Sequence, residues 1–157
     1  NEVSFTKALF HGAVPEEMIF PWPELGKDER ENLTLLLEGV RSFAAREIDA
    51  ARIDREARMP PAVLQGMRDL GLFGLNIPHE YGGRGLSTTA YARVVQELAS
   101  IDASVAVTLA AHLSLGTLGV ILFGTEAQKR SFLPRLATGE MIEGQRLPDD
   151  KKQRCPS

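Results

Sequence analysis

The sequence predicts an all-α fold, a bundle of about five helices joined by short connections. Three observations support this prediction. Apolar residues recur at intervals of three and four along several segments, which places them on one face of a helix. Prolines, which break helix interiors, cluster between those segments. No segment alternates polar and apolar residues over the length of a strand.

The first predicted helix covers about 28–51 and opens with Asp28 and Glu31 at the spacing of a capping box. Its apolar residues share one face: Leu33, Leu36, Leu37, Val40, Phe43, Ala44 and Ile48. The second begins at Pro60-Pro61, where a first-turn proline suits a helix. It ends at Gly71, because glycine readily adopts the left-handed conformation that stops a helix.

The third and fifth helices are predicted from their caps. Ser87, Thr88 and Thr89 each suit the N-cap of the third, whose inward residues would be Tyr91, Val94, Val95 and Leu98. The fifth follows Gly124, with Thr125 and Gln128 spaced as a capping box, and stops near Pro134 or Ala137.

The fourth predicted helix runs from Asp102, its N-cap, to about Phe123. It is apolar nearly all round, so we expect it at the centre of the bundle. The uncharged stretch 103–125 is long enough to raise the question of a membrane span. Its serine, threonine and histidine residues, and flanks without a basic cluster, favour a buried helix in a soluble protein instead.

The 157 residues suffice for one domain, predicted over 28–142. The arm 1–27 is rich in aromatic and aliphatic residues, so we expect it to pack against the bundle or a neighbouring domain. The tail 143–157 has almost no apolar residue and is predicted to be disordered.

Charge and cysteine content exclude several function classes. A formal net charge of −3 gives no positive field for phosphates, which argues against nucleic-acid or anionic-membrane binding. The only cysteine, Cys155, rules out a disulfide framework and a Cys-rich zinc site. The N-terminus has neither a basic leader nor an apolar signal core, so we expect no secretion.

Few residues suggest chemistry, and each has a simpler structural interpretation. The Gly82–Gly85 segment resembles a phosphate loop, but no strand precedes it, so a tight turn is preferred. His112 has no metal-ligand partner at helical spacing and is interpreted as a hydrogen-bonded core histidine. Glu80 suits a solvated or capping role better than that of a base. The small residues Ala106, Ala110 and Ala111 either allow close helix packing, the preferred interpretation, or leave room for an apolar ligand.

Three stretches carry a family resemblance. Residues 70–86, LGLFGLNIPHEYGGRGL, resemble the loop signature of the acyl-CoA dehydrogenase N-terminal domain. Residues 123–130, FGTEAQKR, and 132–140, FLPRLATGE, resemble two later family segments in the same order. The arm and residues 108–112, TLAAH, are most similar to the long-chain and very-long-chain branch.

This resemblance implies a fold and a site. The fold would be the helical N-terminal domain of a three-domain flavoenzyme of fatty acid β-oxidation, an oxidoreductase of lipid metabolism. Its fourth helix would line the channel for the fatty acyl tail, where the small Ala111 favours a long substrate. The implied channel residues are Ala106, Val107, Thr108, Ala110, Ala111 and Leu115.

The sequence departs from the family pattern after Glu140. A β-domain with a T-E-P-x-A-G-S-D flavin motif would follow, whereas residues 141–146 read MIEGQR. The family's catalytic glutamate belongs to a later domain, so no catalytic, cofactor-binding or metal residue is assigned here. We therefore expect a truncated or frame-shifted N-terminal domain, inactive alone; the alternative is a stand-alone helical interaction or scaffold module.

The resemblance also implies partners. They are long-chain acyl-CoA, the remaining domains or subunits of an acyl-CoA dehydrogenase, and electron-transferring flavoprotein. FAD is expected in the full-length enzyme and not in this chain alone. The implied compartment is the cytoplasm in a bacterium and the mitochondrion in a eukaryote.

Overall fold

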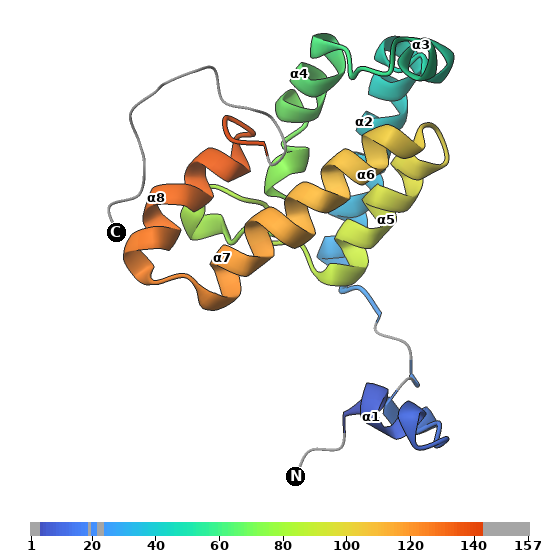
Figure 1. Ribbon diagram of the computed structural model, residues 1–157, viewed down its shortest axis with the longest axis vertical. Coiled ribbons are helices and arrows are strands. Elements are labelled where there is room, and N and C mark those ends of the chain that lie inside the picture. Colours follow the sequence, from blue (N-terminus) through green and yellow to red (C-terminus); the bar gives the residue numbers. More distant parts are fainter. Residues whose placement is uncertain (1–3, 19, 22–23, 143–157) are drawn as a thin grey trace.

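A computed structural model describes residues 4–18, 20–21 and 24–142 of the chain. All regular structure within these ranges is helical, which confirms the predicted all-α class (Figure 1). The predicted disordered tail 143–157 lies outside the described residues, as do Ile19, Trp22 and Pro23 of the arm.

The first predicted helix is in fact two helices. α2 spans Lys27–Glu47, with Gly26 as an N-cap that makes no side-chain bond, so the predicted capping box of Asp28 and Glu31 is wrong. Ile48 is extended, with φ −99° and ψ 105°. Asp49 then caps α3 (Ala50–Glu56) by accepting a hydrogen bond from the Arg52 amide at 3.0 Å. A short polar side chain that caps a new helix competes with continuation of the old one.

Three other predicted boundaries are confirmed. α4 spans Pro61–Asp69 and is followed by Gly71 at φ 64°. α5 spans Thr88–Ala99 and is capped by Ser87, whose hydroxyl accepts from the Ala90 amide.

The cap of the last helix is confirmed as well. α8 spans Glu126–Ala137, and Thr125 and Gln128 form both bonds of the capping box. The helix runs through Pro134 and ends at Ala137, the later of the two predicted ends.

The fourth predicted helix is one continuous rod with an irregular centre. α6 (Ala103–Ala111) begins at Asp102, which accepts from the Val105 amide at 2.9 Å, as predicted. A π-helical segment, η4 (His112–Thr117), joins it directly to α7 (Leu118–Phe123). Figure 1 shows this rod crossing the molecule beside α5 and reaching the turn before α8.

The rod is not central, which corrects the expectation of a helix buried all round. Its inward residues include Val105, Leu109 and Leu113, each fully buried. Its outward residues include Val107 and Leu115, with 65% and 72% exposed surface. Apolar composition alone does not reveal which face of a helix a neighbour covers.

The main core lies between α2, α4, α5, α6 and the 72–75 turn. It includes Val40, Phe43, Met67, Phe73, Val94, Leu98 and Leu109. A smaller cluster of Ile77, Tyr81, Leu133, Leu136 and Ala137 joins the following loop to α8. Two short 3-10 turns, η2 (Leu72–Gly74) and η3 (His79–Tyr81), shape that loop.

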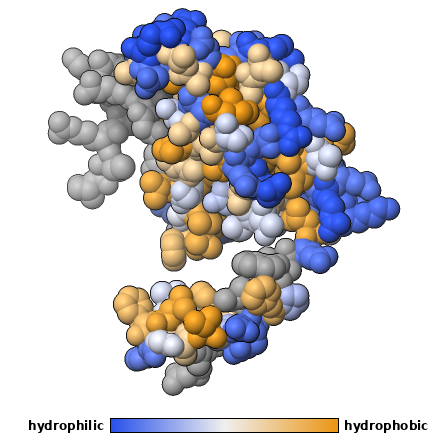
Figure 2. Space-filling view, turned by 90° about the vertical axis from the view of Figure 1, so that its right-hand side faces the viewer, coloured by the Kyte–Doolittle hydropathy of each residue, from blue (hydrophilic) through white to orange (hydrophobic). Residues whose placement is uncertain are grey.

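The arm folds apart from the bundle. α1 (Phe5–Phe10) and the 3-10 turn η1 (Glu16–Met18) lie at a distance from the other helices in Figures 1 and 2. Its exposed apolar side chains are Leu9, Phe10, Val14, Met18 and Phe20. The expected packing of the arm on the bundle surface is therefore not observed, and packing on a neighbouring domain stays a prediction.

Candidate functional site

The α6–η4–α7 rod exposes large apolar side chains along its length. Its exposed large side chains are Val107, Leu115, Leu118, Leu122 and Phe123. Exposed apolar patches of this kind mark surfaces that another molecule or domain covers. We call this surface the apolar face.

The predicted channel residues divide between two sides of the rod. Val107 and Leu115 are exposed on the apolar face, and the half-buried Ala111 lies between them, four residues from each. Ala106 is only 3% exposed and belongs to the main core. Thr108 and Ala110 are half-buried, and the Thr108 hydroxyl donates to the Ser104 carbonyl at 2.8 Å.

The π segment explains how the apolar face is aligned. A π-helix bonds each amide to the carbonyl five residues back and accommodates one more residue than an α-helix. Short π segments inside α-helices occur frequently at functional sites. The extra residue in 112–117 rotates everything after it relative to α6.

Asn76, from the loop between η2 and η3, binds the π segment. Its amide nitrogen donates to the Leu113 carbonyl at 2.9 Å. The Thr117 hydroxyl lies 3.0 Å from Asn76 Oδ1 and 2.7 Å from the Leu113 carbonyl, and donates its one hydrogen to either. No sequence pattern indicated this role, because the partners are 37 and 41 positions from Asn76.

His112 is a core histidine, as predicted. It is fully buried, and its Nε2 donates to the Leu136 carbonyl of α8 at 3.1 Å. Phe73 packs edge-on against the imidazole, with ring centroids 5.1 Å apart. These contacts tie the start of the π segment to α8 and to the main core.

The glycine segment is a closed turn and not an anion site. Gly82 and Gly85 have positive φ values of 82° and 58°. The amides of residues 82–86 all donate to carbonyls of the segment 74–79. A loop that binds phosphate must present free amides, so the predicted tight turn is confirmed.

Tyr81 and Glu126 line a shallow hollow beside Glu80, Arg130 and Pro134. The Tyr81 hydroxyl donates to Glu126 Oε2 at 3.0 Å. Burial, and then this hydrogen bond, raise the pKa of Tyr81 to about 12. Glu80 itself is exposed, which agrees with the predicted solvated role.

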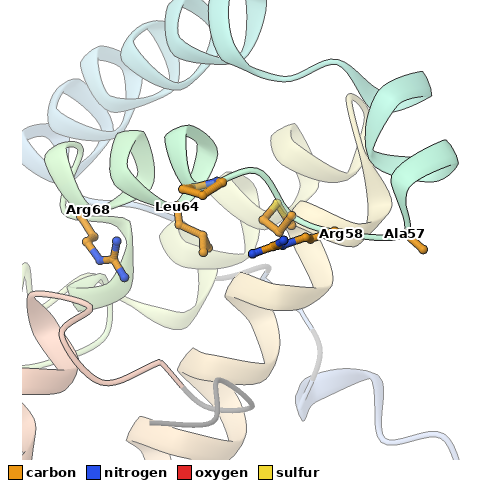
Figure 3. A pocket seen from close by; sticks show the side chains of 6 residues that line it. Ala57, Arg58, Leu64 and Arg68 are labelled. Atoms are coloured by element: carbon orange, nitrogen blue, oxygen red, sulfur yellow. The ribbon is translucent and has the colours of Figure 1, made fainter. Parts of the chain in front are cut away.

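A second hollow, of about 530 Å³, lies beside the linker 57–59 and α4. Arg58 and Arg68 line it together with Met59 and Leu64, and Figure 3 shows the Arg58 side chain extending toward Leu64. Arg68 Nε also donates to the Gly139 carbonyl at 3.0 Å. Guanidinium groups stay protonated at neutral pH, so this hollow offers no general base.

Metal-ligating clusters and membrane-spanning helices are the remaining kinds of site. Among the described residues, no three or more His, Cys, Asp or Glu side chains group closely enough to hold a metal ion. Ala103–Phe123 is long and apolar enough to cross a membrane, with a mean hydropathy of 2.0. Core helices of soluble proteins share this length and composition, so one such helix is weak evidence for a membrane span.

The comparisons with known proteins give a consistent result. A family model described as "Acyl-CoA dehydrogenase, N-terminal domain" matches residues 30–140. Very long-chain specific acyl-CoA dehydrogenases of mitochondria are 42% identical in Macaca fascicularis and 40% in Homo sapiens, over 140 residues. The probable acyl-CoA dehydrogenase FadE10 of Mycobacterium tuberculosis is 39% identical over the same length. Each match covers 88% of this chain and 21% of the relative.

Solved structures agree. Butyryl-CoA dehydrogenase from Megasphaera elsdenii aligns with a TM-score of 0.63 and 31% identity, over 76% of this chain and 32% of that chain. A chain from a structure of the electron transferring flavoprotein of Acidaminococcus fermentans aligns with a TM-score of 0.59 and 32% identity. That match covers 76% of this chain and 31% of the other.

Proposed function

The chain belongs to the acyl-CoA dehydrogenase family through its N-terminal domain, and on that premise we propose that its apolar face forms one wall of a channel for a long acyl tail. The domain would then serve a long-chain or very-long-chain acyl-CoA dehydrogenase. The chain spans about a fifth of the length of its curated relatives, so the oxidation of acyl-CoA is proposed for the whole protein and not for this domain alone.

The observation that supports this proposal is the composition of the apolar face. Val107, Ala111 and Leu115 present hydrocarbon to solvent along successive turns of one helix. Removing each methylene of an acyl tail from water contributes about 0.8 kcal/mol. The small side chain of Ala111 leaves space between two larger neighbours, which suits a long tail.

The glycine turn does not fit the diphosphate of a flavin dinucleotide. A flavin dinucleotide carries a diphosphate that needs free amides or cations, and the amides of the glycine turn are all used internally. Residues 141–157 do not contain the T-E-P-x-A-G-S-D motif. We therefore propose FAD as a cofactor of the whole protein.

The partners and compartment are proposed on the same basis. The whole protein would take long-chain acyl-CoA as substrate and pass electrons to electron-transferring flavoprotein. It would act in the mitochondrion of a eukaryote or in the cytoplasm of a bacterium. Determining the nucleotide sequence beyond the codon for Glu140, in all three frames, tests for the β-domain motif, and absence of that motif would favour a stand-alone module.

The test of the wall is Ala111→Leu in a complete enzyme that carries this domain. The larger side chain should lower the ratio of kcat/KM for long over short acyl-CoA roughly tenfold, as crowding a hydrophobic pocket by a few methylenes does. Ala51→Leu, in α3, is the matched control and should leave the ratio unchanged. If Ala111→Leu left the ratio of kcat/KM for long over short acyl-CoA unchanged, the proposal that the apolar face forms a channel wall would be refuted.

A second candidate function is a stand-alone interaction or scaffold module. It is favoured by exposed apolar residues on both the rod and the arm, such as Phe123 at 86% and Phe10 at 88% exposure. Size-exclusion chromatography of the 157-residue chain, alone and mixed with a complete relative, tests it. A soluble monomer that does not bind the relative would contradict this function.

A further inference from the structure

We infer that Asn76 is a positioning residue that selects which side chains of the rod form the proposed acyl wall. The inference rests on the proposed function. It concerns a residue outside the rod, which acts through its hydrogen bonds to Leu113 and Thr117.

The helical register shows what the extra residue of the π segment achieves. At about 100° per residue, a regular α-helix would place Ser114 and Leu118 in line with Val107 and Ala111. One inserted residue replaces them with Leu115, Gly119 and Leu122. Leu115 is 72% exposed and Leu118 is 40% exposed, so the shifted register places the more exposed leucine in line with Val107, while Ser114 is exposed as well.

The inward face changes in the same way. A regular helix that buries Leu109 and Leu113 would continue that inward stripe through Gly116 and Thr117 together. The structure buries Thr117 completely and leaves Gly116 half-buried. The inward stripe is thus shifted toward Thr117, whose hydroxyl lies 3.0 Å from Asn76 Oδ1.

Asparagine is suited to hold this register because its amide supplies a donor and an acceptor at once. The donor satisfies the Leu113 carbonyl, and the acceptor lies opposite the Thr117 hydroxyl. An aspartate at position 76 would lack the donor, and an alanine would lack both groups. His112, at the start of the π segment, is fixed separately by its bond to Leu136, so Asn76 controls only the register of the later residues.

The first measurement monitors the register in the 157-residue chain. In Asn76→Ala and Asn76→Asp, we expect the Thr117 methyl to turn outward, and its relaxation by a soluble paramagnetic agent to rise several-fold in NMR spectra. The Leu113 methyls should keep their protection. A Thr117 methyl that stays protected in both variants would overturn the inference whatever the function of the wall.

The second measurement monitors chain-length preference in a complete enzyme carrying the domain. Thr117→Val should change the ratio of kcat/KM for long over short acyl-CoA by roughly tenfold, and Thr117→Ser, which keeps the hydroxyl, should restore it. Because both variants leave Asn76 in place, they test the positioning role even if the Asn76 variants do not fold.

The two proposals fail in different ways. A ratio that responds to Ala111→Leu but not to Asn76→Ala or Thr117→Val would overturn the positioning role and leave the wall intact. A ratio that responds to none of the three would refute the wall, and the positioning role with it.

Discussion

Arg41 of α2 and Glu97 of α5 form a bidentate ion pair at the surface of the bundle. Arg41 Nε donates to Glu97 Oε1 at 2.7 Å, and Nη2 donates to Oε2 at 2.9 Å. The guanidinium hydrogen bond, opposed by burial, lowers the pKa of Glu97 below its usual range. The pair therefore fastens two core helices by a contact that depends on pH.

Arg41→Met should lower the free energy of unfolding slightly at neutral pH, because pairs this exposed contribute little. A carboxylate with a lowered folded pKa stabilises above the unfolded glutamate pKa of about 4.3. That contribution is lost as pH falls through the lower folded value. Urea unfolding between about pH 7 and about pH 3 should show that the difference in free energy of unfolding between the native chain and Arg41→Met shrinks in acid. Arg55→Met is the control. A free-energy difference that does not change with pH would contradict the lowered pKa of Glu97.

Tyr81 should ionise near pH 12, above the ordinary tyrosine value of about 10. Because the folded pKa is raised, the contribution of Tyr81 to the stability of the fold is complete below about pH 10. It is lost as pH rises through about 12. Glu126→Gln should move the pKa only part of the way back, since burial is the larger cause. Absorbance titration of the phenolate, with Tyr91→Phe removing the other tyrosine, measures both values. A midpoint near the ordinary value of about 10 in the native chain would show that Tyr81 is solvated.

Leu113 and Leu115 offer a matched pair, two positions apart on one rod. Leu113→Ala should destabilise the fold by about 2–5 kcal/mol, because it leaves a cavity at a fully buried site. Leu115→Ala, at a 72% exposed site, should change stability by less than about 0.5 kcal/mol. Thermal or urea unfolding of the two variants checks the contrast. Equal losses would mean that the rod is covered on both faces.

Gly83 is required by close approach rather than by its φ value. A Cβ at this position would lie 2.0 Å from the Ile77 carbonyl oxygen, so Gly83→Ala should shift the turn and cost about 1–3 kcal/mol. Gly119→Ala has nothing within 4 Å and lies in α7. It should stabilise by about 0.5–1 kcal/mol through helix propensity. Comparing the free energies of unfolding of the two variants tests this close approach. A Gly83→Ala variant as stable as the native chain would disprove it.

The sequence predicted three helix N-caps correctly, but it did not reveal the break between α2 and α3. Ser87, Asp102 and Thr125 were identifiable as N-caps from their short polar side chains, and in the structure each accepts from an amide three residues away. α3 was missed because the amphipathic pattern continues through Ile48 while the backbone does not.

The candidate site was predictable only in part. Of the residues that the family resemblance implied for the channel, Val107 and Leu115 are exposed and Ala106 faces the core, and the channel itself stays a prediction. Asn76 was not predictable, because its effect depends on a contact that only the folded loop provides.

The Asn76 contacts also bear on the order of folding. They close a loop of 37 positions, and the bond from His112 to Leu136 closes one of 24. Long closures cost chain entropy and form after local helix. The π segment should therefore form late in folding, after the rest of the rod has become helical. Variants at Asn76 would then accelerate unfolding and leave the refolding rate nearly unchanged.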